Sequence, residues 1–131
     1  NHIFNKNTGR RIFAVIPVHV YGHIMDMRKL KKIAKKYKLK IVEDAAESLG
    51  SFYLGKHAGT MGEVGIISFN ANKVVAGIAG GGAILTDDED KAELFRKLRR
   101  HGNNEVLGRN SKMLMLNACF INFRLISLIS L

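Results

Sequence analysis

An alternation of apolar and amphipathic segments near the start of the chain restricts the fold more than any other feature. Residues 11–18 form an apolar run, residues 26–38 repeat apolar side chains at helical spacing, and residues 39–42 form a second apolar run. The sequence therefore predicts strand, helix and strand within roughly 30 residues, the length of a βαβ unit. Such a crossover joins parallel strands, so we expect a right-handed connection in an α/β fold. Asp26 is the expected N-cap of the helix.

The downstream sequence extends this pattern without a domain boundary. A turn is expected at residues 21–22, and a glycine-rich loop over 50–62. Strands are predicted over 64–69 and 83–85. Acidic side chains over 86–89 predict the start of a helix that ends near Gly102.

The last segment, residues 114–131, is apolar and lacks the turn signals found earlier in the chain. Asn117, Asn122 and Arg124 interrupt it, which argues against a membrane span. We therefore predict one helix that is buried or faces a partner.

The positive charge of the chain is concentrated in one segment. The net charge is +10, and residues 28–40 carry eight basic side chains with no acidic one. Leu30, Ile33, Ala34 and Tyr37 fall at helical spacing among them, which favours an amphipathic helix with a solvated basic face. A phosphate-rich partner is the alternative, although no aromatic stacking platforms interleave with the charges.

The number of cysteines and the composition of the N-terminal residues indicate the cellular compartment of the protein. Cys119 is the single cysteine, so it has neither a disulfide partner in this chain nor companions at zinc-site spacing. A reducing compartment is the simplest fit, and residues 1–11 lack the apolar core of a signal peptide. These features predict a cytoplasmic location.

One lysine is the candidate catalytic residue, and one aspartate is the candidate cofactor-binding residue opposite it. Lys73 follows the predicted strand over 64–69 and precedes a glycine cluster, and Asp44 follows the apolar run 39–42. A lysine can form a Schiff base with an aldehyde cofactor, and a carboxylate at a strand end can keep a pyridine nitrogen protonated. The alternatives are a plain loop lysine, and an N-cap or structural ion pair for Asp44.

Three further features are weaker signals. Ser68 could donate a hydrogen bond to a phosphate, but serine is common at strand ends. The glycine cluster over 77–82 lacks the strand-then-helix context of a dinucleotide-binding fingerprint, and no Gly-Lys-Ser/Thr follows it. It is therefore expected to form a tight turn into a strand. The histidines lack metal-ligand spacing on one helix face, so they are expected to be hydrogen-bonded or exposed; they are His19, His23, His57 and His101.

These motifs together resemble the DegT-type sugar aminotransferases, which are pyridoxal-phosphate enzymes acting on nucleotide-linked keto sugars. The matching segments occur in the family's order and at similar spacing; they are 16–22, 42–50, 62–65, 68–73, 81–86, 98–102 and 108–113. The resemblance implies a partial three-layer large domain of a fold-type-I pyridoxal-phosphate-dependent transferase, with a mostly parallel sheet and flanking helices.

The resemblance also implies roles for individual residues. Lys73 would carry the cofactor covalently and act as general acid and base, and Asp44 would pair with the pyridine nitrogen. Glu47 would lie against the cofactor ring or its hydroxyl, and Ser68 would bind the phosphate. Asn110 would reach the phosphate held by a neighbouring subunit of a homodimer. A nucleotide sugar and an amino acid such as glutamate are the implied partners, and nucleic acid, a membrane and a metal are not implied.

The chain departs from the family pattern in length and in detail. Residues 1–120 are expected to be part of the cofactor-binding domain and residues 121–131 a divergent apolar tail, without the N-terminal phosphate segment and the C-terminal small domain. Lys112 stands where relatives usually carry arginine. Dehydratase relatives carry histidine in place of the lysine, so Lys73 favours transamination. The open alternatives are an inactive remnant and a basic nucleic-acid-binding module.

Overall fold

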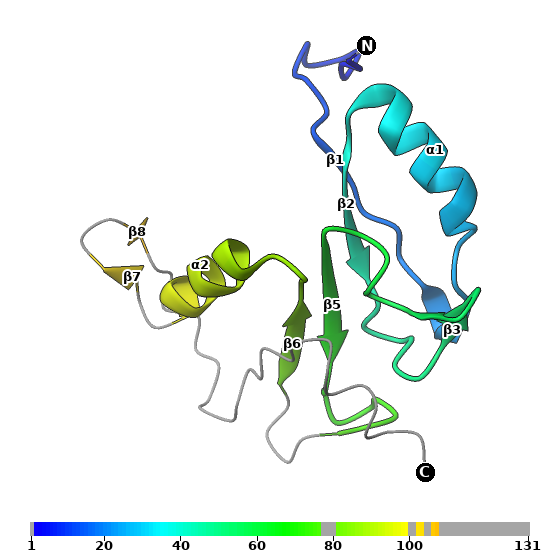
Figure 1. Ribbon diagram of the computed structural model, residues 1–131, viewed down its shortest axis with the longest axis vertical. Coiled ribbons are helices and arrows are strands. Elements are labelled where there is room, and N and C mark those ends of the chain that lie inside the picture. Colours follow the sequence, from blue (N-terminus) through cyan, green and yellow to red (C-terminus); the bar gives the residue numbers. More distant parts are fainter. Residues whose placement is uncertain (1, 77–80, 100–101, 104–105, 108–131) are drawn as a thin grey trace.

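The computed structural model describes residues 2–76, 81–99, 102–103 and 106–107 (Figure 1). The strands are β1 (Ala14–Val15), β2 (Lys40–Asp44), β3 (Phe52–Tyr53), β4 (Lys56–His57), β5 (Val64–Ser68), β6 (Gly82–Leu85), β7 (Gly102–Asn103) and β8 (Val106–Leu107). The helices are α1 (Met27–Tyr37) and α2 (Glu89–Arg99), and a 3-10 turn covers Val20–Gly22. Asn110 and the predicted helix over 114–131 lie outside the described residues.

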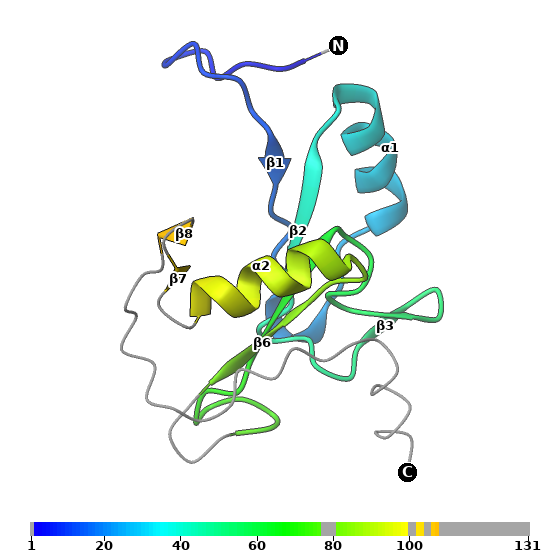
Figure 2. The same cartoon turned by 60° about the vertical axis from the view of Figure 1, so that its left-hand side comes forward.

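The main sheet has the order β1-β2-β5-β6. β1, β2 and β5 are parallel, and β6 is antiparallel to β5. The predicted βαβ unit is present, since α1 joins the parallel strands β1 and β2. The expected α/β class with a mostly parallel sheet and flanking helices is confirmed. α1 lies beside β1 and β2, and α2 lies beyond β6 on the other side of the strands (Figures 1 and 2).

The two faces of the sheet differ in burial. Ile41, Glu43 and Ala45 on β2 and its end are buried, as are Ile67 on β5 and Leu85 on β6. α1 and the segment that follows β4 cover this face, through Met27, Ala34, Ala58 and Met61. The opposite face carries Val42 and Asp44, which pair in register with Val64 and Ile66, and these side chains are half-buried or exposed. The core therefore lies on one side, and Asp44 projects from the other.

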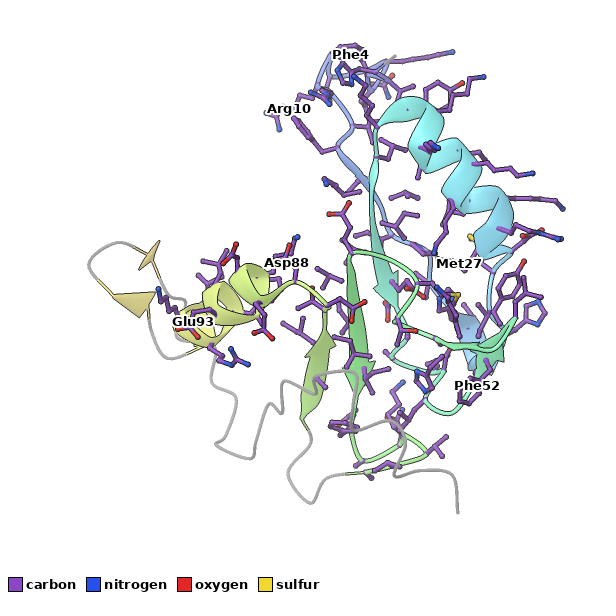
Figure 3. The ribbon with its side chains drawn as sticks, in the orientation of Figure 1. Phe4, Arg10, Met27, Phe52, Asp88 and Glu93 are labelled. Carbon is purple, nitrogen blue, oxygen red and sulfur yellow. The ribbon has the colours of Figure 1, made fainter. Side chains whose placement is uncertain are left out.

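Helix α1 begins where the sequence predicts. The Asp26 carboxylate accepts a hydrogen bond from the Lys29 N–H at 3.0 Å, which caps the first turn. Met27 lies on the side of the helix that faces the strands, and long side chains extend from the opposite side (Figure 3). Ile33 was expected on the apolar face but is 49% exposed. It lies about 100° around the helix from the buried Ala34, away from the side of α1 that packs against the strands.

Asp26 also joins α1 to the β3–β4 hairpin, and its ionisation should contribute to stability. The Lys29 N–H and the Tyr53 hydroxyl, at 2.8 Å, lower the pKa of Asp26 to about 2. Since the folded pKa lies below the unfolded one, this contribution is complete above pH 4 and is lost as the pH falls toward 2. We expect Asp26→Asn to have a lower free energy of unfolding than the wild type at pH 6, as measured by urea unfolding. This difference between the two proteins should disappear between pH 4 and 2. Asp87→Asn, at an exposed aspartate, is the matched control. A difference between Asp26→Asn and the wild type that does not change with pH would contradict a stabilising role for the ionised Asp26.

Two sequence predictions are corrected by the structure. The strand expected over 11–18 shrinks to Ala14–Val15, although the carbonyls of Phe13 and Pro17 still accept hydrogen bonds from β2. Pro17 has no N–H to donate, which interrupts the ladder. The loop expected over 50–62 contains the β3–β4 hairpin. Its turn residues Leu54 and Gly55 both have positive φ, and leucine is an unusual residue at the first of these positions.

The remaining expectations agree with the described residues. β5 covers most of the strand predicted over 64–69, and β6 includes the strand predicted over 83–85. α2 starts at Glu89 and carries Glu89 and Asp90 in its first turn. Asp88 accepts a hydrogen bond from the Lys91 N–H at 3.0 Å and so caps α2. The division at residue 120 falls outside the described residues and stays a prediction.

Candidate active site

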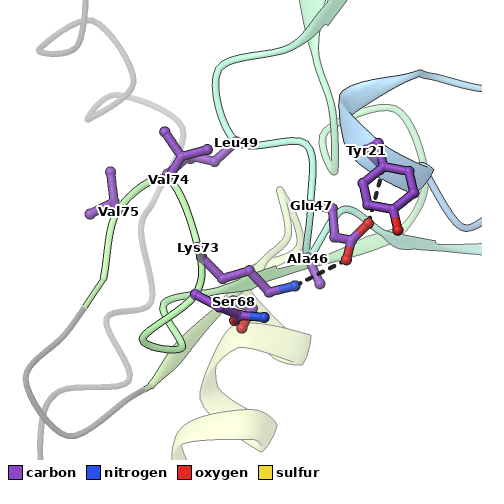
Figure 4. Close-up of a pocket in the computed structure, with 9 residues that line it drawn as sticks. Tyr21, Ala46, Glu47, Leu49, Ser68, Lys73, Val74 and Val75 are labelled. Atoms are coloured by element: carbon purple, nitrogen blue, oxygen red, sulfur yellow. Dashed lines mark hydrogen bonds and ion pairs between the residues drawn. The ribbon is translucent and has the colours of Figure 1, made fainter.

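A pocket of about 340 Å³ lies beyond the carboxyl ends of the parallel strands β2 and β5 (Figure 4). Its lining comes from the 3-10 turn, from the segment after β2, and from the end of β5 and the segment after it; the residues are Tyr21, Ala46, Glu47, Leu49, Ser68, Asn72, Lys73, Val74 and Val75. Ligands of open α/β sheets bind at this end of the strands. The fold therefore puts three of the predicted site residues around one cavity.

Lys73 reaches the pocket from a short turn after β5. Its backbone N–H donates to the Asn70 carbonyl at 2.9 Å, which closes the turn. Its Nζ lies 3.2 Å from Glu47 Oε1, and the lysine side chain is only 17% exposed. A partly buried amine that faces a cavity is the arrangement that a nucleophilic lysine needs.

Glu47 connects Lys73 to the 3-10 turn. Its Oε1 pairs with Lys73, and its Oε2 accepts a hydrogen bond from the Tyr21 N–H at 3.0 Å (Figure 4). The Tyr21 N–H and then the Lys73 ammonium hold the pKa of Glu47 below its usual range. Glu47 is therefore a carboxylate at neutral pH.

Ser68 and Asp44 share the open face of the sheet. Asp44 pairs with Ile66 across β2 and β5, and Ser68 lies two residues further along β5 on the same face. The Asp44 carboxylate accepts the Ala46 N–H at 3.1 Å, and Ser68 Oγ accepts the Asn70 N–H at 3.3 Å. Asp44 is at the end of its strand, as expected, but it is not among the residues that line the pocket.

The structure thus brings Glu47, Ser68 and Lys73 together and leaves Asp44 beside them on the same sheet end. Tyr21 is a lining residue that the sequence presented only as part of a turn. Nothing in its local sequence indicates the pocket, because the contact to Glu47 spans 26 residues.

A second group of polar residues lies on the buried face, and sequence reasoning missed it. The Glu43 carboxylate accepts hydrogen bonds from the backbone N–H groups of Gly59, Met61 and Gly62 and contacts His19 Nε2 at 3.1 Å. Both side chains are fully buried. The available signal in the sequence was a charged residue at a strand position whose side chain is expected to point into the core. His57 is also buried, and it accepts the Gly50 N–H at 2.8 Å.

The comparisons with known proteins identify the family. The sequence model of the DegT/DnrJ/EryC1/StrS aminotransferase family matches residues 2–129. This chain belongs to that family. Aminotransferases of the DegT family depend on pyridoxal phosphate.

Individual relatives agree with this assignment. A dTDP-3-amino-3,4,6-trideoxy-alpha-D-glucose transaminase from Micromonospora megalomicea subsp. nigra is 38% identical over 79% of this chain and 29% of its own length. The DegT/DnrJ/EryC1/StrS aminotransferase structure from Brucella abortus has a TM-score of 0.71 at 32% identity, covering 81% of this chain and 28% of that one. The S. venezuelae DesV structure with a ketimine intermediate has a TM-score of 0.71 at 39% identity, covering 79% and 29%. The chain spans less than a third of each of these proteins.

The described residues of this DegT-family chain contain neither a membrane-spanning helix nor a metal-binding cluster. No helix among them is long and apolar enough to cross a membrane. No group of three or more histidine, cysteine, aspartate or glutamate side chains among them is arranged to hold a metal ion.

Proposed function

We propose that this chain carries the cofactor site of an aminotransferase that moves an amino group from an amino acid, such as glutamate, to a nucleotide-linked keto sugar. The observation that carries the proposal is the Lys73 amine, partly buried in a pocket at the carboxyl ends of the parallel strands. The transaminase relatives supply the reaction class and the nucleotide-sugar substrate class.

The residues around the pocket fit pyridoxal phosphate. A volume of about 340 Å³ falls in the range of about 300–1,000 Å³ typical of small-molecule sites. An amine, a hydroxyl and a carboxylate converge there from Lys73, Ser68 and Glu47, and the Asp44 carboxylate lies on the same sheet end. When bound, the cofactor supplies an electron sink that stabilises negative charge at the amino-acid carbon.

Each of these side chains has a proposed task. Lys73 holds the cofactor covalently and, once released, moves a proton at the amino-acid carbon as general acid and base. Asp44 accepts the hydrogen bond of the protonated ring nitrogen, and Glu47 lies against the ring or its hydroxyl. Ser68 Oγ donates to the phosphate. Asn110 contacts the phosphate bound by a neighbouring subunit.

The wider setting follows from the same proposal. The product is an amino sugar for a surface polysaccharide or a secondary metabolite, and the enzyme works as a homodimer in the cytoplasm. The proposed reaction requires neither nucleic acid nor a membrane.

A chain that does not turn over substrate is the second candidate. The observation in its favour is the exposure of apolar side chains around the pocket, since Val74 is 86% and Val75 51% exposed. Such a chain would bind the cofactor weakly or would pair with an intact relative.

Trapping of the cofactor separates the two candidates. The purified chain is incubated with pyridoxal phosphate, reduced with borohydride and mapped by peptide mass spectrometry. We expect one dominant adduct on Lys73, lost in Lys73→Ala and retained in Lys56→Ala, which removes an exposed lysine of β4. An adduct should be followed by assays with glutamate and a nucleotide-linked keto sugar. Labelling scattered over surface lysines, or none, would reject the proposed site in this chain.

A further inference from the structure

Tyr21 has an unfavourable backbone conformation beside the pocket. Its φ of 51° and ψ of 34° lie in the left-handed region, which non-glycine residues rarely occupy. Its side chain lines the pocket and is 91% exposed, so burial of the ring does not compensate for the conformation. Strained backbone of this kind persists where surrounding contacts impose it, and it gathers at functional sites.

Contacts on both sides of Tyr21 impose this conformation. His19 is fully buried; its N–H donates to the Asp44 carbonyl at 3.0 Å, and its carbonyl accepts the Ser48 hydroxyl at 2.6 Å. After Tyr21, the His23 N–H donates to the Val20 carbonyl at 2.9 Å. The turn is therefore attached to the end of β2, which carries Asp44, and to the segment after it, which carries Glu47.

The consequence of this conformation is the direction of the Tyr21 N–H. It donates to Glu47 Oε2 at 3.0 Å, while Glu47 Oε1 lies 3.2 Å from Lys73 Nζ. Because each oxygen of the carboxylate has its own partner, rotation of the carboxylate would break one contact or both. The Tyr21 backbone thereby determines where Glu47 holds the lysine amine (Figure 4).

We propose that Tyr21 is a positioning residue for Lys73, and that it acts through its left-handed backbone N–H and the Glu47 carboxylate rather than through its aromatic ring. The importance of this arrangement for catalysis rests on the proposed function. The arrangement itself can be tested without the cofactor.

The test measures the reactivity of Lys73 toward formaldehyde with cyanoborohydride. The lysine amine adds to the aldehyde carbon, water leaves, and hydride from the reagent reduces the C=N bond. Peptide mass spectrometry gives the labelling rate of Lys73 relative to Lys56, an exposed lysine that serves as reference in the same sample. Glu47→Gln should raise this relative rate about two- to fivefold, since it removes an ion pair of ordinary surface strength.

Two variants of Tyr21 remove the ring but have opposite backbone preferences. Glycine adopts positive φ readily, so Tyr21→Gly should keep the N–H contact and label like the wild type. Isoleucine is β-branched and disfavours positive φ, so Tyr21→Ile should lose the contact and label like Glu47→Gln. Equal rates in the two Tyr21 variants, or no effect of Glu47→Gln, would overturn the proposal.

An NMR titration covers the case in which Tyr21→Ile does not fold. In the wild-type chain, the Tyr21 amide proton shift should follow the ionisation of Glu47, with a midpoint below the usual range for glutamate, and the titration should vanish in Glu47→Gln. An amide shift that does not titrate would reject the contact. Absence of a cofactor adduct on Lys73, combined with the predicted formaldehyde rates, would reject the proposed function and leave this inference standing.

Discussion

Replacing Glu43 with alanine is expected to lower the free energy of unfolding by about 3–5 kcal/mol. The Glu43 carboxylate is fully buried and accepts hydrogen bonds from three backbone N–H groups of the segment 59–62, in addition to its contact with His19. Alanine would leave these donors buried without an acceptor, and each such group costs about 1–3 kcal/mol. The measurement is urea unfolding followed by circular dichroism.

Glu63→Ala is the matched control for this prediction. Glu63 lies in the segment just before β5 and pairs with Lys40 at 2.9 Å, with both side chains substantially exposed. Its removal should cost about 1 kcal/mol or less. Glu43→Gln keeps one acceptor oxygen and should fall between the two. Equal costs for Glu43→Ala and Glu63→Ala would show that the buried carboxylate does not organise the 59–62 segment.

Replacing Gly65 with alanine is the second large effect that we expect. A Cβ atom built on Gly65 would lie 1.9 Å from the Gly59 carbonyl oxygen, so the backbone of one segment would have to move. Overpacking of a buried site costs about 1–3 kcal/mol, and more where backbone is displaced. We expect a loss of about 3 kcal/mol in urea unfolding.

The control for Gly65 is a glycine in open space. Gly50 has a φ of +83° and no atom within 4 Å of its added Cβ, so Gly50→Ala has only the conformational cost of about 1–2 kcal/mol. A Gly65→Ala variant as stable as Gly50→Ala would mean that the 59–62 segment can withdraw from β5. It would then not be a rigid cover of the buried face.

The buried network around Glu43 and the candidate cofactor site are adjacent along β2. Glu43 and Asp44 are neighbours on β2 and point to opposite faces of the sheet, so the carboxylate that anchors the 59–62 segment stands beside the one proposed to contact the cofactor. His19 contacts Glu43 through its ring and Asp44 through its backbone N–H. The buried network should therefore stabilise the end of β2, which carries Asp44 and is followed by Glu47.

Much of this site could be predicted from the sequence because its signals are local. Helical spacing over 26–38 and Asp26 as N-cap located α1, and the apolar runs located β2 and β5. Lys73 and Ser68 follow from their places at the end of a strand, and they do line one pocket with Glu47. Periodicity and capping are readable over a few residues, since neighbouring side chains cause them.

Only the tertiary structure decided which of these residues meet. The strand position of Glu43 indicates burial, but its N–H partners lie 16 to 19 residues away and cannot be read locally; the Tyr21 contact to Glu47 spans 26 residues. The β3–β4 hairpin was missed because Leu54 is not a usual residue at its position of positive φ. The sequence by itself determined α1, β2, β5 and the candidate lysine, because these depend on spacing along the chain. The folded chain determined the buried carboxylate, the antiparallel β6 and the Tyr21 contact, because these depend on distances between segments.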